Sequence, residues 1–147
     1  MEISPVFKTS TVNECKVINL PKFATTAGHI TAINNSVEIP FDTRRVYYLY
    51  DIPSGETRGG HAHYNLHQLI VAAMGSFDVI LNDGQNEKRI ALNQPNHGLL
   101  VLPGVWRELE NFSAGAILLV LASETYLKED YIREINNFKN QKYGINI

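Results

Sequence analysis

The sequence predicts an all-β protein, and two observations carry this prediction. Short runs rich in β-branched and aromatic residues recur along most of the 147 residues, and turn-forming residues separate them about every eight to twelve positions. These runs give about nine or ten strands, a number and spacing typical of a β-sandwich or a barrel. Only the tail differs, because Leu127, Tyr131, Ile135 and Phe138 recur at helical spacing. We therefore expect a short helix over residues 128–140.

The strands are expected in a regular order along the chain. Residues 1–14 are polar and suit a frayed arm or an edge strand. The later strands are expected at residues 16–20, 28–33, 44–52, 68–73, 77–81, 88–92, 98–102, 106–110 and 116–122. The first two of these form a hairpin-like unit that can pack on its own body or on a partner. In the third, alternation places Tyr48 on one face and both Arg45 and Tyr47 on the other.

Length and composition favour one soluble domain spanning residues 1–147. A chain of this length buries a sufficient core without disulfides. The net charge of −2 gives no basic excess for nucleic acid, so an anionic ligand requires local arginines. The single cysteine, Cys15, fits a reducing compartment, and neither a membrane span nor a secretory leader is recognisable. We expect a cytoplasmic protein that contacts neither nucleic acid nor membrane.

The chemistry of the chain is expected in the segment from Gly55 to Gln68. It contains three of the five histidines, and an arginine, Arg58, precedes them. His61 and His63 are separated by one residue, so in an extended segment they point to the same face. This concentration exceeds what packing requires. A neutral histidine pair suits either a metal ion or proton transfer.

The spacing of this segment resembles the first signature of the cupin superfamily, a small jelly-roll barrel. The matching positions are Gly55, His61, His63, Gln68 and Gly75, and a second signature, one residue short, follows from Gly98 through Pro103-Gly104 to Asn111. In metal-binding cupins, a glutamate and a later histidine complete the ligand set.

Two substitutions at these ligand positions argue against a metal ion. Gln68 takes the place of the glutamate and Arg107 that of the late histidine. An amide is a weaker ligand than a carboxylate, and an arginine repels a cation. We expect a site without metal or cofactor, in which the histidines transfer protons.

Further strings are similar to the nucleotide-sugar 3,4-ketoisomerases of bacterial surface-polysaccharide synthesis. The resemblance covers about residues 16–138, and its strings are residues 45–48, 58–63, 75–84, 103–106, 121–123 and 130–133. It implies a metal-free enzyme that moves the ketone of dTDP-4-keto-6-deoxyglucose from C4 to C3, toward deoxyamino sugars such as those of O-antigen. It also implies a homodimer that exchanges amino-terminal strands, about residues 1–35. Enzymes giving galacto and gluco products share these motifs, and the family usually has histidine at the position of Arg107.

The implied chemistry gives the candidate residues their expected roles. We expect His63 to carry the proton between C3 and C4 and His61 to hold the enediolate oxygen. Arginine forks suit a diphosphate, and an aromatic ring suits the sugar or the base. Gln68 is expected to face the barrel in place of His67. The expected substrate-binding residues are Arg45, Tyr48, Arg58, Gln68, Trp106 and Arg107.

Three alternative functions use a similar barrel. A sugar-nucleotide epimerase would keep the ketone at C4 and invert a neighbouring centre, which product NMR detects. A cupin that only binds a nucleotide sugar or a partner enzyme would change its affinity alone on mutation of His61 and His63. A metal-dependent oxygenase would contain metal on elemental analysis.

Overall fold

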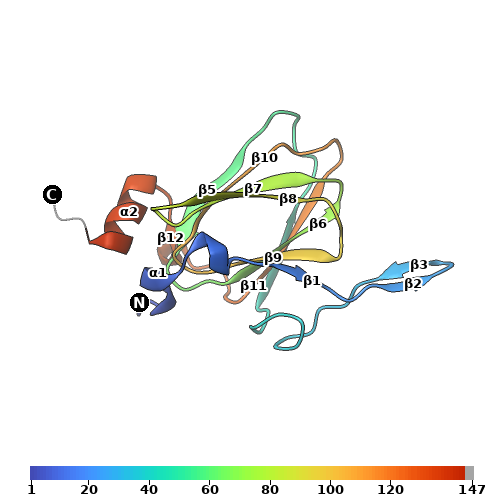
Figure 1. Cartoon of the computed structure of the whole chain (residues 1–147), viewed down its shortest axis with the longest axis horizontal. Coiled ribbons are helices and arrows are strands. Elements are labelled where there is room, and N and C mark those ends of the chain that lie inside the picture. Colours follow the sequence, from blue (N-terminus) through green and yellow to red (C-terminus); the bar gives the residue numbers. More distant parts are fainter. Residues whose placement is uncertain (145–147) are drawn as a thin grey trace.

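Two five-stranded antiparallel sheets face each other in the computed structural model, which describes residues 1–144 (Figure 1). The first sheet has the order β1 (Val17–Asn19), β9 (His97–Val101), β6 (Gln68–Met74), β11 (Ile117–Ala122) and β4 (Arg45–Leu49). The second has the order β12 (Tyr131–Ile132), β5 (Arg58–His63), β10 (Trp106–Glu110), β7 (Phe77–Asn82) and β8 (Glu87–Leu92). The predicted all-β jelly-roll barrel is confirmed.

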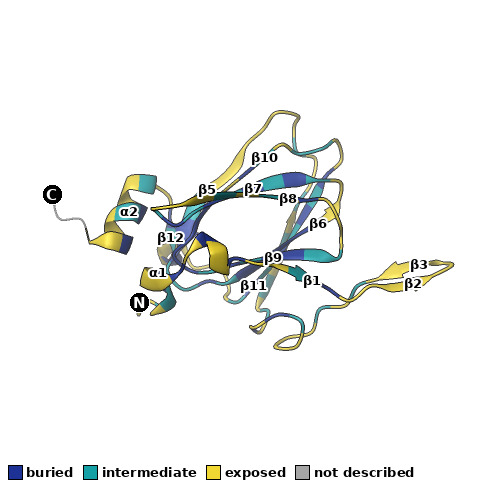
Figure 2. Ribbon diagram, viewed as in Figure 1, coloured by how far each residue is buried: buried dark blue, intermediate teal, exposed yellow. Residues whose placement is uncertain are grey.

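The interior is apolar because the strands alternate inward and outward side chains. Along β7, buried Phe77, Val79 and Leu81 alternate with partly exposed residues. They meet side chains of the first sheet such as Leu99 and Val120, and all five are at most 1% exposed. Burying an aliphatic side chain of this size contributes about 1.5–3 kcal/mol. Figure 2 shows the buried residues lining the space between the sheets.

The tail differs from the predicted helix over residues 128–140. A 3₁₀ turn, η2 (Lys128–Asp130), and the short strand β12 come first, and the helix α2 (Ile135–Tyr143) begins only afterwards. Backbone pairing of β12 with His63 and Ala62 takes precedence over the helical spacing of the apolar side chains. Glu134 caps α2 by accepting from the amides of Asn136 and Asn137.

The amino terminus is packed on the body of the same chain. It forms a helical turn, α1 (Val6–Thr9), and a 3₁₀ turn, η1 (Val12–Glu14), where a frayed arm or an edge strand was expected. Phe7 is fully buried against Phe138 of α2. The Lys142 ammonium of α2 donates to the Ser10 carbonyl at 2.6 Å and to the Gly104 carbonyl. These contacts close one end of the barrel.

A hairpin of β2 (Phe23–Thr25) and β3 (Gly28–Ile30) extends away from the barrel. Figures 1 and 2 show that it projects beyond β1 and is exposed along its length. Phe23 and Ile30 are 60% and 62% exposed. Within residues 1–144, no helix has the length and apolar character needed to cross a membrane.

Candidate active site

A cavity of about 170 Å³ lies between the two sheets. This volume is below the roughly 300–1,000 Å³ of pockets that enclose a whole small ligand, so the cavity accommodates only part of a nucleotide sugar. Aliphatic side chains from several strands share its wall with polar, charged and aromatic side chains. Its lining residues are Tyr47, Leu49, Arg58, Gly59, His61, Gln68, Ile70, Arg107, Leu109, Leu118, Val120 and Arg133.

The pairing of β5 with β10 brings His61 and Arg107 together. They are directly opposite in register, and a bulge follows between Arg107 and Glu108. Gly59 lies beside this bulge at a φ of +100°, and a Cβ there would stand 3.2 Å from the Arg107 carbonyl oxygen. Glycine thus permits the close approach of the two strands that places both side chains in the cavity.

His61 lies on the cavity wall as a neutral imidazole. Burial is the main cause that lowers the pKa of His61 to about 2, and the charge of Arg107 lowers it further. The Nε2 atom of His61 is buried and has no hydrogen-bond partner. A neutral ring with a free Nε2 can accept a proton from a bound substrate.

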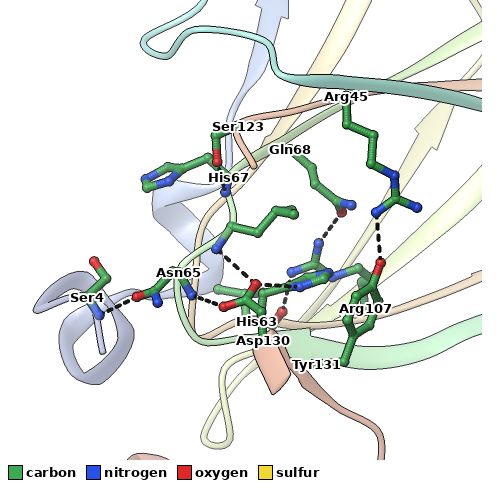
Figure 3. A network of polar contacts seen from close by, with 12 residues as sticks. Ser4, Arg45, His63, Asn65, His67, Gln68, Arg107, Ser123, Asp130 and Tyr131 are labelled. Carbon is green, nitrogen blue, oxygen red and sulfur yellow. Dashed lines mark hydrogen bonds and ion pairs between the residues drawn. The ribbon is translucent and has the colours of Figure 1, made fainter. Parts of the chain in front are cut away.

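His63 lies behind His61 and does not line the cavity. The two rings meet edge to face with their centroids 4.9 Å apart, and the Tyr131 ring covers His63 at 4.4 Å. The Nδ1 atom of His63 lies 3.0 Å from Oδ2 of Asp130 (Figure 3). Burial lowers the pKa of His63, and nearby guanidinium groups, Arg107 foremost, act in the same direction.

Arg107 places a buried positive charge in the cavity wall. It is 2% exposed, and burial lowers its pKa only to about 10, so the guanidinium keeps its charge at neutral pH. It donates to Oε1 of Gln68 and, at 2.9 Å, to the Val105 carbonyl, while its Nε has no partner. Within residues 1–144 no carboxylate oxygen lies within 4.0 Å of it. A buried guanidinium without a counter-ion is suited to an anion or to a developing oxyanion.

Three further arginines lie near the site, and two of them line the cavity. Arg58 and Arg133 are exposed and line the cavity, where their guanidinium groups can reach a diphosphate. Arg45 donates to the Tyr131 hydroxyl at 3.2 Å and lies over the Tyr47 ring at 4.6 Å (Figure 3). Arg45 therefore supports aromatic side chains beside the site and is not itself a lining residue.

Gln68 lies inside the barrel, as the sequence predicted. It is 1% exposed, accepts from Arg107 and donates from Nε2 to the Tyr47 hydroxyl at 3.1 Å. His67 lies outside, with its ring 6.3 Å from that of Phe41. Within residues 1–144 no group of three or more histidine, cysteine, aspartate and glutamate side chains is arranged to hold a metal ion.

The structure places two of the predicted substrate contacts away from the cavity. Tyr48 is 59% exposed on the outer face of β4, because alternation turns Tyr47 inward in its place. Trp106 is 5% exposed and packs against Phe138 under α2, so it belongs to the apolar core. The alternation already indicated that Arg45 and Tyr48 could not both face the interior, since they occupy opposite faces of one strand, yet both were expected at the site.

The sequence reasoning missed Tyr47, Tyr131, Arg133 and Asp130 as site residues. For Tyr47, the signal was its shared face with Arg45. For Asp130, Tyr131 and Arg133, the signal was the string 130–133 of the resemblance, but the contact of Asp130 with His63 spans 67 positions of the chain and was not readable from it.

Comparison with known proteins agrees with this geometry. The family model named FdtA, described as WxcM-like, C-terminal, matches residues 13–143. The TDP-4-oxo-6-deoxy-alpha-D-glucose-3,4-oxoisomerase of Aneurinibacillus thermoaerophilus is 44% identical over 134 residues, which are 91% of this chain and 96% of that protein.

Solved structures show the same relationship. The TDP-quinovose 3,4-ketoisomerase WlaRB of Campylobacter jejuni has a TM-score of 0.84 at 44% identity, covering 88% of this chain and 99% of that one. Another similar structure is a histidine-to-asparagine variant of the 3,4-ketoisomerase QdtA of Thermoanaerobacterium thermosaccharolyticum in complex with TDP-4-keto-6-deoxyglucose. Its TM-score is 0.88 at 38% identity, and the match covers 92% of this chain and 98% of that one. A dTDP-4-dehydrorhamnose 3,5-epimerase of Bacillus anthracis is 18% identical and shares the fold alone. Its TM-score is 0.72, and the match covers 83% of this chain and 79% of that one. The chain therefore belongs to the FdtA family of sugar 3,4-ketoisomerases, as its sequence strings predicted.

Proposed function

We propose that the protein is a sugar-nucleotide 3,4-ketoisomerase that converts TDP-4-keto-6-deoxyglucose to a TDP-3-keto-6-deoxyhexose without a cofactor. The relatives named above carry this reaction or this substrate in their names. The observation that carries the proposal is the cavity wall itself, where the neutral His61 stands opposite the unpaired guanidinium of Arg107. This pair combines a base with an electrophile at one small cavity.

The reaction moves one proton on carbon and one on oxygen. A base removes the proton from C3, and the electron pair forms an enediolate across C3 and C4. A proton then returns to carbon at C4, the O3 hydroxyl loses its proton and O4 gains one. The ketone ends at C3, and no oxidant is needed.

The positions of the side chains suggest their roles in these steps. The sequence assigned the proton shuttle to His63 and the enediolate oxygen to His61. Because His61 lines the cavity, we assign the carbon-bound proton to it, and because the Nε2 atom of His63 is free beside the His61 ring, we assign the hydroxyl proton to His63. The Arg107 guanidinium stabilises the enediolate oxygen, since a permanent donor in a dry site is most effective there.

The nucleotide is expected to lie outside the cavity. Its diphosphate fits Arg58 and Arg133, the two exposed arginines of the lining. Negative charge at these positions opposes the positive field on the histidines. Binding of the diphosphate would therefore raise the pKa of His61 and improve it as a base.

The proposed reaction is tested by incubating the protein with TDP-4-keto-6-deoxyglucose in D₂O and identifying the product by NMR. We expect a product with its ketone at C3 and deuterium at C4, and the same reaction in H₂O retains the C4 proton, whose coupling to H5 gives the configuration at that carbon. A product that keeps its ketone at C4 would identify an epimerase. Binding with neither product nor deuterium incorporation would identify a non-catalytic cupin.

We also propose that two copies pair by exchanging the β2–β3 hairpin. The support is the exposed hairpin, with Phe23 and Ile30 uncovered, and the exposed outer face of β4 at Val46 and Tyr48, which Tyr50 continues just after the strand. Residues 6–19 pack on their own body, so the exchanged part is shorter than the expected residues 1–35.

Sedimentation equilibrium tests this pairing. We expect the wild type to have twice the 16.5 kDa mass of one chain, and the Phe23→Asp, Ile30→Asp double variant to have the mass of one chain. A monomeric wild type would refute the exchange.

A cytoplasmic location, metal independence and a place in polysaccharide synthesis stay predictions from the sequence.

A further inference from the structure

The carboxylate of Asp130 distinguishes the two histidines of the site. We propose that Asp130 is a positioning residue, which fixes the tautomer of His63 and stabilises its protonated form. This inference rests on the proposed isomerase and adds a residue to it. His63 contacts a carboxylate, whereas His61 lies opposite a guanidinium.

Asp130 is held by hydrogen bonds on every side. Its Oδ1 accepts from the Asn65 amide at 2.8 Å, and its Oδ2 accepts from the Leu66 amide at 3.3 Å and faces Nδ1 of His63 at 3.0 Å. Its backbone carbonyl accepts from the Tyr64 amide at 3.1 Å. A carboxylate offers only acceptors, so it satisfies the two amides and the His63 ring donor at once.

The loop around Asn65 is anchored in turn by the amino terminus. The Asn65 side chain accepts from the Ser4 amide at 2.6 Å and donates to the Glu2 carbonyl at 2.7 Å. Figure 3 shows the series from Ser4 through Asn65 and Asp130 to His63. The carboxylate is therefore fixed relative to the His63 ring before any substrate binds.

This arrangement determines which nitrogen of His63 can react. With a carboxylate at Nδ1, the neutral ring carries its hydrogen there, and Nε2 keeps a lone pair. That Nε2 is buried and has no partner. When His63 takes up the hydroxyl proton, the imidazolium faces the Asp130 carboxylate at 3.0 Å, which opposes the effect of burial. His61 lacks such a partner and is suited to the carbon-bound proton alone.

Asp130→Asn changes this chemistry while nearly preserving shape. Both carboxylate oxygens face N–H donors, so the new amide must direct its NH₂ group toward one of them. If NH₂ faces His63, the hydrogen of the ring moves to Nε2, and this nitrogen can no longer accept a proton from the hydroxyl. If it faces Asn65, two donors oppose each other, and the side chain is displaced.

The test measures two rates in D₂O for wild type and Asp130→Asn, namely deuterium exchange at C3 of the substrate and ketone migration. Removal of the C3 proton by His61 is retained, but transfer of the hydroxyl proton is not. We expect migration to fall by about a hundredfold to ten-thousandfold, as for a misplaced tautomer in other acid–base dyads. Exchange at C3 should fall by no more than about tenfold. The ratio of exchange to migration therefore rises.

Asp83→Asn is the matched control. Asp83 is 2% exposed and accepts from the amides of Val12, Gln85 and Asn86, but it lies in the β7–β8 turn. The Asp83→Asn substitution should lower stability as Asp130→Asn does and leave the ratio of C3 exchange to ketone migration unchanged. In a His63→Asn background, Asp130→Asn should cause no further loss of ketone migration, because its effect passes through His63.

The outcomes separate this inference from the function on which it rests. A wild type that does not move the ketone would refute the isomerase itself. If the wild type is active and Asp130→Asn reduces both rates by one factor, or changes neither, the positioning role is refuted and the isomerase is retained.

Discussion

Replacing His61 by asparagine is expected to abolish both deuterium exchange at C3 and ketone migration. Asparagine cannot accept a proton to form a cation, and loss of a general base typically costs about a hundredfold to ten-thousandfold in rate. Both rates fall because both begin with removal of the C3 proton. Affinity for TDP, measured by calorimetry, should stay within about threefold, since the diphosphate is expected at Arg58 and Arg133, at the edge of the cavity.

His67→Asn provides the control for this substitution. His67 neighbours the site in sequence, but its ring lies outside the barrel near Phe41. Both rates should therefore equal those of the wild type. A His61→Asn variant that keeps more than a tenth of either rate would remove His61 from the role of base.

The sequence predicted the histidine pair because the relevant geometry is local. One intervening residue in an extended strand suffices to place two side chains on one face. The same alternation separated Arg45 and Tyr47 from Tyr48, but it did not say which face is the interior. That depends on the pairing of β4 with β11 and on the sheet opposite, which no short stretch of sequence specifies.

The tail shows how a correct period leads to a wrong element. Tyr131, Ile135 and Phe138 recur at helical spacing, yet Tyr131 belongs to a strand. Its backbone pairs with His63, a tertiary contact that outweighs local spacing. The same pairing carries Asp130 to His63, so the error about the helix and the omission of Asp130 have one cause.

Arg107 was identified as a site residue in a different way. Its position was found by resemblance to a motif in which it is unusual, and the sequence placed it among the substrate-binding residues, with the arginines suited to a diphosphate. Its 2% exposure excludes the mouth, where a diphosphate is expected, and places its charge beside His61. Burial alone thus distinguishes Arg107 from Arg58, which the sequence had grouped with it.

Arg107→Met is expected to reduce catalysis strongly without reducing stability. Removing one oxyanion donor typically lowers kcat by about a hundredfold to a thousandfold. Exchange at C3 and migration should fall together, because the enediolate is common to both. Yet an unpaired buried guanidinium is costly to desolvate, and replacing buried charges by apolar side chains is often neutral or stabilising by about 1–4 kcal/mol.

A measurement of stability distinguishes a catalytic role of Arg107 from a structural one. Arg107→Met leaves Oε1 of Gln68 and the Val105 carbonyl without their donor, which costs about 1–3 kcal/mol for each buried group. This cost offsets the relief of desolvation, so the free energy of unfolding in urea should stay within about 2 kcal/mol of the wild-type value. A loss of more than about 4 kcal/mol would instead make Arg107 a structural residue. An active site that is disabled while its fold persists would show that the buried charge is retained for the enediolate.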